Sequence, residues 1–352
     1  MGKTLKIENR EIRLLKSYSS ANYKSKTVLS NSIFDFIELS LMREANDKSK
    51  EALFYWRQAK NFYLATLNIP IESQPLTAYY CCMNATKALL AIRNIPTVNI
   101  SHGVSASRNG TKGNIVSDEI VYLGGGVLCE LSRILGDPVT KQSYKLQDLF
   151  YNLVCVHRTF SITFPSFTEL YVPISEISFE PVANSNQIYA KFAIDQRYAS
   201  GHIKQYMSKC FEKISMDNQG EMSYRCKKRF TWDIHIPLKQ RLEHLDRYHK
   251  KIRRNFHYIY STKMLWYIKK ELPKNTHIVD RSSMTIIYGI LHWLSELVRY
   301  NPAAFSRLLS SKQNWLIREF MDIGLNQFID EIGSEITGVN VMCKGHKPLT
   351  NR

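Results

Sequence analysis

One segment of the sequence is rich in cations and aromatic side chains, two kinds of group that contact nucleic acids. Between Arg225 and Arg254 there are eleven Lys or Arg residues against three Asp or Glu residues. Basic side chains bind phosphate groups whatever the base sequence, and aromatic rings stack on unpaired bases. The candidate phosphate contacts are Arg225, Lys227, Lys228, Arg229, Lys250, Lys251, Arg253 and Arg254, and the interleaved rings are Phe230, Trp232 and Tyr248.

The same pattern also fits a charged, solvated surface whose aromatic side chains face the core, and the segment alone does not decide between the two. The whole chain of 352 residues has a formal net charge of +17 and a sequence pI of about 9.5. An excess of this size favours a polyanionic partner. We therefore predict that RNA or DNA binds the protein, and a partner protein or a second copy of the chain is the alternative.

A second stretch, nearer the start of the chain, predicts two packed helices and then a His-Gly turn, His102–Gly103. The first helix, over 51–66, carries aromatic residues at helical spacing, which indicates a buried face. The second has Ser73 in position to cap it and Pro75 in its first turn. This helix is apolar on two faces, which is typical of a central helix. Its face of mostly small residues consists of Ala78, Cys81, Cys82, Ala85, Ala88, Leu89 and Ile92.

Asn84 and Lys87 are nearly the only polar side chains on the middle turns of this second helix, and they are neighbours at i and i+3. Either they reach a groove, or they satisfy each other near solvent. Long charged side chains often extend to solvent from buried helices, which favours the second alternative. The adjacent Cys81 and Cys82 are expected in the core, where thiols are inert. His102 either caps the preceding helix through its ring or takes part in catalysis.

Several of these residues carry a resemblance. The pattern Ala78-Tyr79-Tyr80, then Asn84 to Leu90, then His102-Gly103, resembles the central helix of HEPN-type helical domains. Together with Trp56 and the segment Leu294 to Pro302, it resembles more specifically the YaaC-like family of bacterial proteins. The YaaC-like resemblance implies a fold and no settled activity. The HEPN resemblance implies a dimeric helical protein that binds or cuts RNA, often in prokaryotic toxin or phage-defence systems.

A HEPN-type ribonuclease would need an Arg to hold the scissile phosphate and a His one or two turns away to transfer a proton, without a metal. Arg229 and His235 have such a spacing, and with His102 they are the catalytic candidates. Pairs at this spacing arise by chance, and these two lie outside the helices at 118–157 where the resemblance would place them. We therefore predict no catalysis. Arg299 either anchors two domains through a buried carboxylate contact or grips a phosphate.

The length of the chain predicts two domains, or one domain with a large insertion, and the local patterns predict the mainly α class with a smaller β part. The chain exceeds the usual size of one hydrophobic core. We expect an N-terminal helical bundle at 1–165, a mixed β and basic segment at 166–280, and a C-terminal helical region at 281–352. Seven cysteines, an odd number, indicate a reducing compartment. No stretch has the pattern of a signal peptide or a membrane span, so we predict a cytoplasmic protein without cofactor, metal or membrane partner.

The local signals predict the following elements. We expect helices at 32–46, 118–136, 145–157, about 198–214, from Ser282 or Ser283 to Asn301–Pro302, and from about Gln313 to Gly338, and a loose tail after it. A β-hairpin is expected around 184–186, and MSYRCKKRFTWDIHI, NFHYIYS and MLWYIKK are candidate strands that pair together. The run Gly124–Gly126 would allow a kink or a close helix contact. Asp330 and Glu331 are expected on the solvated side of the last helix.

The sequence therefore predicts a cytoplasmic nucleic-acid-binding or assembly component without catalysis of its own. A metal-independent ribonuclease is the first alternative, and a protein-interaction module whose charge is incidental is the second. A role in phage defence follows from the HEPN resemblance alone.

Overall fold

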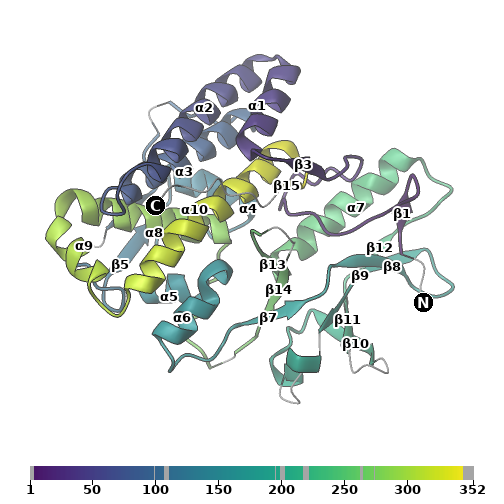
Figure 1. The fold of residues 1–352 in the computed structure, drawn as a ribbon. Coiled ribbons are helices and arrows are strands. Elements are labelled where there is room, and N and C mark those ends of the chain that lie inside the picture. Colours follow the sequence, from purple (N-terminus) through teal and green to yellow (C-terminus); the bar gives the residue numbers. More distant parts are fainter. Residues whose placement is uncertain are drawn as a thin grey trace.

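Helices and strands gather in different parts of the molecule (Figure 1). The computed structural model describes residues 4–98, 100–106, 111–194, 196–198, 203–216, 222–261, 265–272 and 274–343. Its long helices lie together, and most of its strands form a separate part beside them. The predicted class, mainly α with a smaller β part, is confirmed.

The helical part is built from helices at both ends of the chain. They are α1 (Ile33–Glu44), α2 (Asp47–Leu67), α3 (Gln74–Ile92), α8 (Ser283–Tyr300), α9 (Pro302–Leu309) and α10 (Asn314–Thr337). Side chains of Ser32, Asn46 and Ser282 accept backbone N–H groups at the starts of α1, α2 and α8, which offsets the missing bonds of a first turn. Gly338, with φ 71°, ends α10 in the left-handed conformation.

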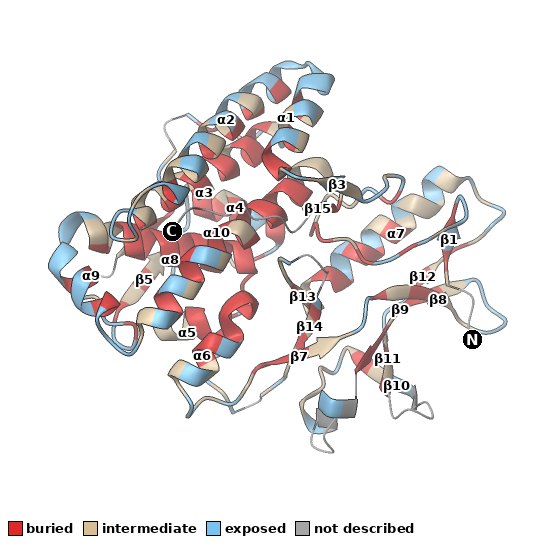
Figure 2. Ribbon diagram, viewed as in Figure 1, coloured by how far each residue is buried: buried red, intermediate tan, exposed pale blue. Residues whose placement is uncertain are grey.

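The central position predicted for the second helix is confirmed. The α3 helix packs against α2, α8 and α10, and its middle turns are almost entirely buried (Figure 2). Pro75 lies in its first turn, as expected. Ser73 precedes the helix but makes no capping hydrogen bond with its side chain, so that detail of the prediction is wrong.

The helix predicted over 118–136 is wrong in its first half. Residues Glu119–Tyr122 form strand β5, which pairs with β4 (Val104–Ala106) and β6 (Gln142–Lys145), and helix α4 begins only at Val127 and ends at Leu135. Burial alternates along β5, which is the period of a strand. The helix predicted at 145–157 is not continuous. This region forms helix α5 (Leu146–Tyr151), a short 3-10 helix (Val154–Val156) and the start of helix α6 (His157–Thr163).

Most of the described strands of the β part belong to two antiparallel sheets. One has the order β10-β11-β9-β12 with β8 also on β9, and the other has the order β13-β14-β7. Their bounds are β7 (Tyr171–Ile174), β8 (Ser178–Pro181), β9 (Gln187–Ile194), β10 (Phe211–Met216), β11 (Met222–Cys226), β12 (Phe230–Thr231), β13 (Phe256–Ile259) and β14 (Leu265–Lys269). Helix α7 (Leu238–Ile252) runs beside them (Figure 1).

The predicted hairpin is confirmed, and two other predictions for this part are wrong. Strands β8 and β9 pair across a turn in which Asn184 has φ 54°. Strand β14 pairs with β13 on one side and with β7 on the other, and among the described strands neither β13 nor β14 pairs with β11. Where a helix was predicted at 198–214, the described residues form two short 3-10 helices, Gln196–Tyr198 and Ile203–Tyr206, and strand β10. Pairing of β10 with β11 outweighs the local helical preference.

Strands near both ends of the described chain take part in sheets. Strand β3 (Val28–Ser30) pairs in parallel with β15 (Val341–Cys343), so the start of the predicted loose tail is a strand. Short strands β1 (Lys6–Ile7) and β2 (Arg10–Glu11) precede it. Asp330 and Glu331 of α10 are buried, which corrects the prediction that they lie on its solvated side.

Buried apolar side chains of the described residues form two clusters. The helical cluster combines α1 to α6 with α8 to α10, so 1–165 and 281–352 share one core. The β cluster includes side chains of the strands and α7 and also Leu5, Ile7, Ile12, Leu14 and Tyr23 near the start of the chain. The described chain therefore begins in the β part, forms the first helices of the helical core, returns to the β part and ends in the helical core.

A substitution on α3 tests its central position. Ala85 is fully buried, and a leucine there would overpack the core, so we expect Ala85→Leu to lower the free energy of unfolding by roughly 1–3 kcal/mol. The matched control is Ala303→Leu on the exposed side of α9, expected to change it by less than about 0.5 kcal/mol. Urea denaturation measures both, and equal effects would contradict the arrangement.

Candidate functional site

A pocket of about 330 Å³ lies where α3, α8 and the turn before β4 meet. We call it the His102 pocket. Its lining residues are Tyr79, Ser101, His102, Gly103, Val104, Leu123, His292, Ser295, Glu296 and Arg299. A volume of this size is at the lower end of the range for ligand pockets, and convergent polar groups in a pocket mark a candidate site.

The His-Gly turn is held in place by the start of α4. The carbonyl groups of Ser101 and His102 accept hydrogen bonds from the first N–H groups of that helix, at 2.8 and 3.1 Å. Gly103 has φ 81°, and a Cβ built on Gly126 would lie 2.5 Å from the Gly103 nitrogen. Glycine is required at both positions, because any side chain would push the two backbones apart. The glycine run thus provides a close contact that fixes His102.

Two tyrosines from α3 and α8 orient the His102 ring. Tyr79 stacks on it with ring centroids 5.6 Å apart, and the Tyr79 Oη lies 2.5 Å from His102 Nδ1. Tyr288 Oη contacts the His102 carbonyl oxygen at 3.5 Å. Burial raises the pKa of Tyr79, so its hydroxyl keeps its hydrogen. Because Nδ1 is the nearest acceptor, we assign the His102 proton to Nε2.

Helix α8 contributes three further side chains from one face. The His292 ring centroid lies 6.2 Å from that of His102, and His292 Nε2 lies 3.8 Å from Glu296 Oε1. The other ring nitrogen, His292 Nδ1, is buried without a hydrogen-bond partner among the described residues. One turn beyond Glu296, the exposed Arg299 side chain lies over the Tyr300 ring.

Both imidazoles of the pocket are neutral at pH 7. Partial burial, and then the charges of Arg299 and Lys87, lower the pKa of His102. Burial lowers the pKa of His292 to about 3, with smaller contributions from His102 and Arg299. Burial also raises the pKa of Glu296. A neutral imidazole has one N–H donor and one acceptor, so the pocket can bind an anion and can move a proton.

A family model described as YaaC-like Protein matches residues 13–336. The chain belongs to the YaaC-like family. The family prediction made from Trp56, the α3 pattern and residues 294–302 is therefore confirmed, and the match includes the elements that form the His102 pocket. No curated protein and no solved structure matches the chain. Among the described helices, none combines the length and apolar composition of a membrane span.

In this YaaC-like protein the polar pair of α3 lies beside the His102 pocket, outside its lining. The Asn84 side chain donates to the Tyr80 carbonyl oxygen of its own helix at 2.8 Å. Lys87 Nζ lies 5.4 Å from the centroid of the Tyr55 ring, a cation–π contact. Neither alternative predicted for the pair is met in full, because each side chain has a different partner. The Lys87 charge still acts on His102.

The predicted pair Arg229 and His235 lies in the β part, and neither lines the His102 pocket. Arg229 precedes β12, and its guanidinium is 3.9 Å from Glu212. His235 is exposed, and its backbone N–H donates to the Asp233 carboxylate at 2.9 Å. The structure therefore brings His102 together with Arg299 and leaves His235 apart.

Five of the predicted phosphate contacts are exposed, and we call them the basic surface: Lys227, Lys228, Arg229, Lys250 and Lys251. The Tyr248 hydroxyl of α7 donates a hydrogen bond to the Lys228 carbonyl oxygen at 2.9 Å, which connects the turn before β12 to α7. Phe230, Trp232 and Tyr248 are buried in the β cluster, which confirms the core alternative for the aromatic residues.

The remaining predicted contacts make bonds within the fold. Arg225 Nε lies 2.7 Å from a Glu212 carboxylate oxygen. Arg253 is buried and donates to the carbonyl oxygens of Lys16 and Phe256, at 2.8 and 2.6 Å. Arg254 forms ion pairs with Asp137 and Asp280. Arg253 cannot reach a ligand from this position.

Sequence reasoning missed Tyr79, His292 and Glu296 as members of the site. A signal for two of them was present, because His292, Glu296 and Arg299 follow one another at i, i+4 and i+7 and must share a helix face. The signal for Tyr79 was hidden, since tyrosine on an apolar helix is expected in the core.

The buried His292 gives a prediction for pH dependence. Its pKa is about 3 in the folded chain against an ordinary 6.5, so the folded state binds fewer protons and loses stability as pH falls from about 6.5 toward 3. The variant His292→Phe has no titratable group at this position. Below about pH 6.5, its free energy of unfolding should therefore fall less steeply with pH than that of the unmodified protein, by about 1.4 kcal/mol per pH unit. Urea denaturation of both proteins between neutral pH and about pH 5 measures the slopes. Parallel slopes would contradict the neutral, buried state of His292.

Proposed function

We propose that this YaaC-like protein binds nucleic acid, specifically RNA. One phosphate group of the RNA would bind in the His102 pocket. The observation that carries the proposal is the exposed Arg299 guanidinium beside two neutral imidazoles. No carboxylate of the described residues lies within 4.0 Å of that guanidinium. Its guanidinium donates to the Tyr300 hydroxyl, and an exposed arginine without a carboxylate partner, next to hydrogen-bond donors, is suited to bind phosphate.

Each group of the pocket has a place in such a contact. The Arg299 guanidinium can bind phosphate oxygens, and the His102 Nε2–H can donate to another of them. Glu296 also lines the pocket, and lone pairs of its carboxylate can accept a ribose 2′-hydroxyl. DNA has no such hydroxyl, and this favours RNA.

The basic surface supports the same proposal from the β part. Its cations are exposed, while the aromatic rings between them are buried. The segment therefore offers phosphate contacts and no stacking platform. Binding through it should depend strongly on salt and weakly on base sequence.

The resemblance of α3 and the His-Gly turn to HEPN-type domains also favours RNA. It extends the proposal to a binding or assembly component of a phage-defence system, on analogy alone. A homodimer, or a complex with a partner protein, fits this role.

Filter binding to a single-stranded RNA tests the proposal. We expect Arg299→Gln to weaken binding by about tenfold or more, because a charge-assisted hydrogen bond is lost. The triple variant Lys227→Ala, Lys228→Ala, Arg229→Ala should reduce the slope of log affinity against log salt by about two.

The matched control is Arg307→Gln, an exposed arginine of α9, which should bind like the unmodified protein. If Arg299→Gln also binds normally, the His102 pocket is not a phosphate site. If the protein binds no RNA at all, the protein-interaction module becomes the better account of its charge.

A second candidate function is metal-independent RNA cleavage, favoured by the pair of imidazoles in one pocket. One could accept the proton of the ribose 2′-hydroxyl as it attacks the phosphorus, while the other gives a proton to the departing 5′-oxygen. Arg299 would hold the phosphate. Such a pair needs one protonated imidazole, and burial keeps His292 neutral. Binding without cleavage is therefore our first proposal.

Incubation of mixed RNA with the purified protein and a chelator separates the two functions. Intact RNA on a denaturing gel is the result expected for a binding protein. Cleavage that is lost in His102→Ala and His292→Ala but retained in His235→Ala would establish the second candidate instead. Cleavage lost only in His235→Ala would move the site to the β part.

A further inference from the structure

A larger cleft, of about 540 Å³, lies at the junction of the two hydrophobic clusters. One wall comes from the β part, at strands β13 and β14, and the other from the segment that leads into α8. Its lining includes Lys209, Phe211, Arg254, Lys269, Glu271 and Arg281. This cleft does not include any residue of the His102 pocket.

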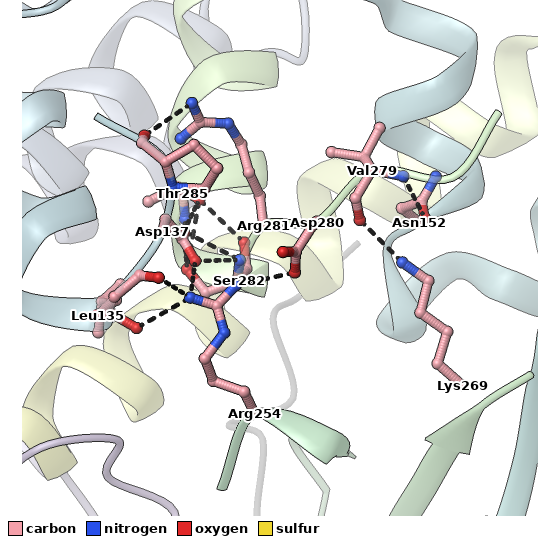
Figure 3. Close-up of polar contacts among 12 residues, drawn as sticks. Leu135, Asp137, Asn152, Arg254, Lys269, Val279, Asp280, Arg281, Ser282 and Thr285 are labelled. Carbon is pink, nitrogen blue, oxygen red and sulfur yellow. Dashed lines mark hydrogen bonds and ion pairs between the residues drawn. The ribbon is translucent and has the colours of Figure 1, made fainter. Parts of the chain in front are cut away.

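The helical wall of the cleft is rigid, because its charged groups are held by one another (Figure 3). Buried Asp137 accepts from the Ser282 backbone N–H and hydroxyl and from the Thr285 hydroxyl, at 3.1, 2.8 and 2.6 Å. Arg254 reaches Asp137 across the junction from the β part at 3.2 Å. Arg281 is buried and donates to Ser132, Pro138 and Tyr144. These groups shape the wall and are not free to rearrange.

The opposite wall carries a cation that lacks a carboxylate partner. Lys269 Nζ donates to the Val279 carbonyl oxygen at 2.8 Å, as Figure 3 shows, and no described carboxylate lies within 4.0 Å of it. Burial lowers the pKa of Lys269 to about 8, while the Asp280 charge raises it and the Arg254 charge lowers it. Burying an ammonium without a carboxylate in contact is costly, and an anion in the cleft would remove part of that cost. At the rim, exposed Lys209 adds a second cation without a carboxylate within that distance.

The cleft also has surfaces for an uncharged part of a ligand. Phe211, Leu272 and Ile278 give it an apolar side suited to a planar ring. The Glu271 carboxylate accepts from the Ser208 hydroxyl at 2.6 Å and has lone pairs left for other hydroxyl groups. A cation for phosphate, a carboxylate for sugar hydroxyls and an apolar surface for a base are thus present in one space. The volume lies within the range for small-molecule sites.

We propose that this cleft is a binding site for a mononucleotide, with its phosphates on Lys269 and Lys209, its ribose on Glu271 and its base against Phe211. A nucleic-acid strand is a poorer occupant, because the cations line one cleft of about 540 Å³ rather than an extended row on the surface. The site is separate from the phosphate contact of the His102 pocket. Since the two walls belong to different clusters, a bound nucleotide joins them and raises the stability of the whole chain.

Isothermal titration of the full chain with ADP, AMP and inorganic phosphate tests the site. We expect saturable binding of ADP and AMP, and binding of inorganic phosphate that is weaker by about tenfold or more. Lys269→Met and Lys209→Met should each weaken ADP binding by about tenfold. The control Lys239→Met, an exposed lysine of α7 outside the cleft, should bind like the unmodified protein.

If Lys269→Met folds poorly, thermal unfolding of Lys209→Met with and without ADP still tests the site. Lys209 is exposed, and its substitution leaves the core intact. ADP should raise the melting temperature of the unmodified chain and of Lys239→Met, and raise it less in Lys209→Met. No saturable binding of ADP or AMP overturns the proposal. Inorganic phosphate that binds as tightly as ADP overturns the nucleotide assignment, and normal ADP binding by both cleft variants overturns the location.

Discussion

The arrangement of the two clusters depends on a buried ion pair between Lys16 and Asp330. The Lys16 ammonium lies 2.8 Å from an Asp330 carboxylate oxygen and donates to the Val341 carbonyl oxygen at 2.9 Å. Tyr258 of β13 donates to the same carboxylate. One interaction thus joins the N-terminal segment, the last helix and the β part. Removing one partner of a buried pair leaves an uncompensated charge and typically costs about 3–5 kcal/mol. This contact fixes how the β part meets the helices. It therefore also fixes the relative position of the two walls of the larger cleft.

A second constraint, close approach of backbones, positions the His102 pocket. The small face of α3 admits the neighbouring helices, and Gly103 and Gly126 let the His-Gly turn touch the start of α4. His102 is therefore placed by backbone contacts, while His292 and Arg299 are placed by the packing of α8 on α3. The same packing buries His292 and keeps its imidazole neutral. The packing of α8 on α3 therefore both stabilises the helical core and sets the protonation state of His292. Substitutions on the small face of α3 should change the free energy of unfolding and also the chemistry of the pocket.

Local signals in the sequence predicted much of the fold because they act within a few residues. Capping by Ser32 and Ser282, the helix end at Gly338 and the hairpin at Asn184 belong to this class. The errors come from long-range partners. Strand β10 exists because β11 pairs with it, β15 because β3 does, and Asp330 is buried because Lys16 reaches it. The same limit applies to the site: His102 and Arg299 were identified singly, but the packing of α3 on α8 that brings them together with Tyr79 and His292 has no local signal.

The central claim is that the His102 pocket binds a phosphate of RNA. A crystal structure of the protein with a short single-stranded RNA tests it most directly. We predict a phosphate group within hydrogen-bonding distance, about 2.7–3.2 Å, of both the Arg299 guanidinium and His102 Nε2. RNA bound in ordered form on another face, with Arg299 and His102 making no contact to it, would contradict the claim.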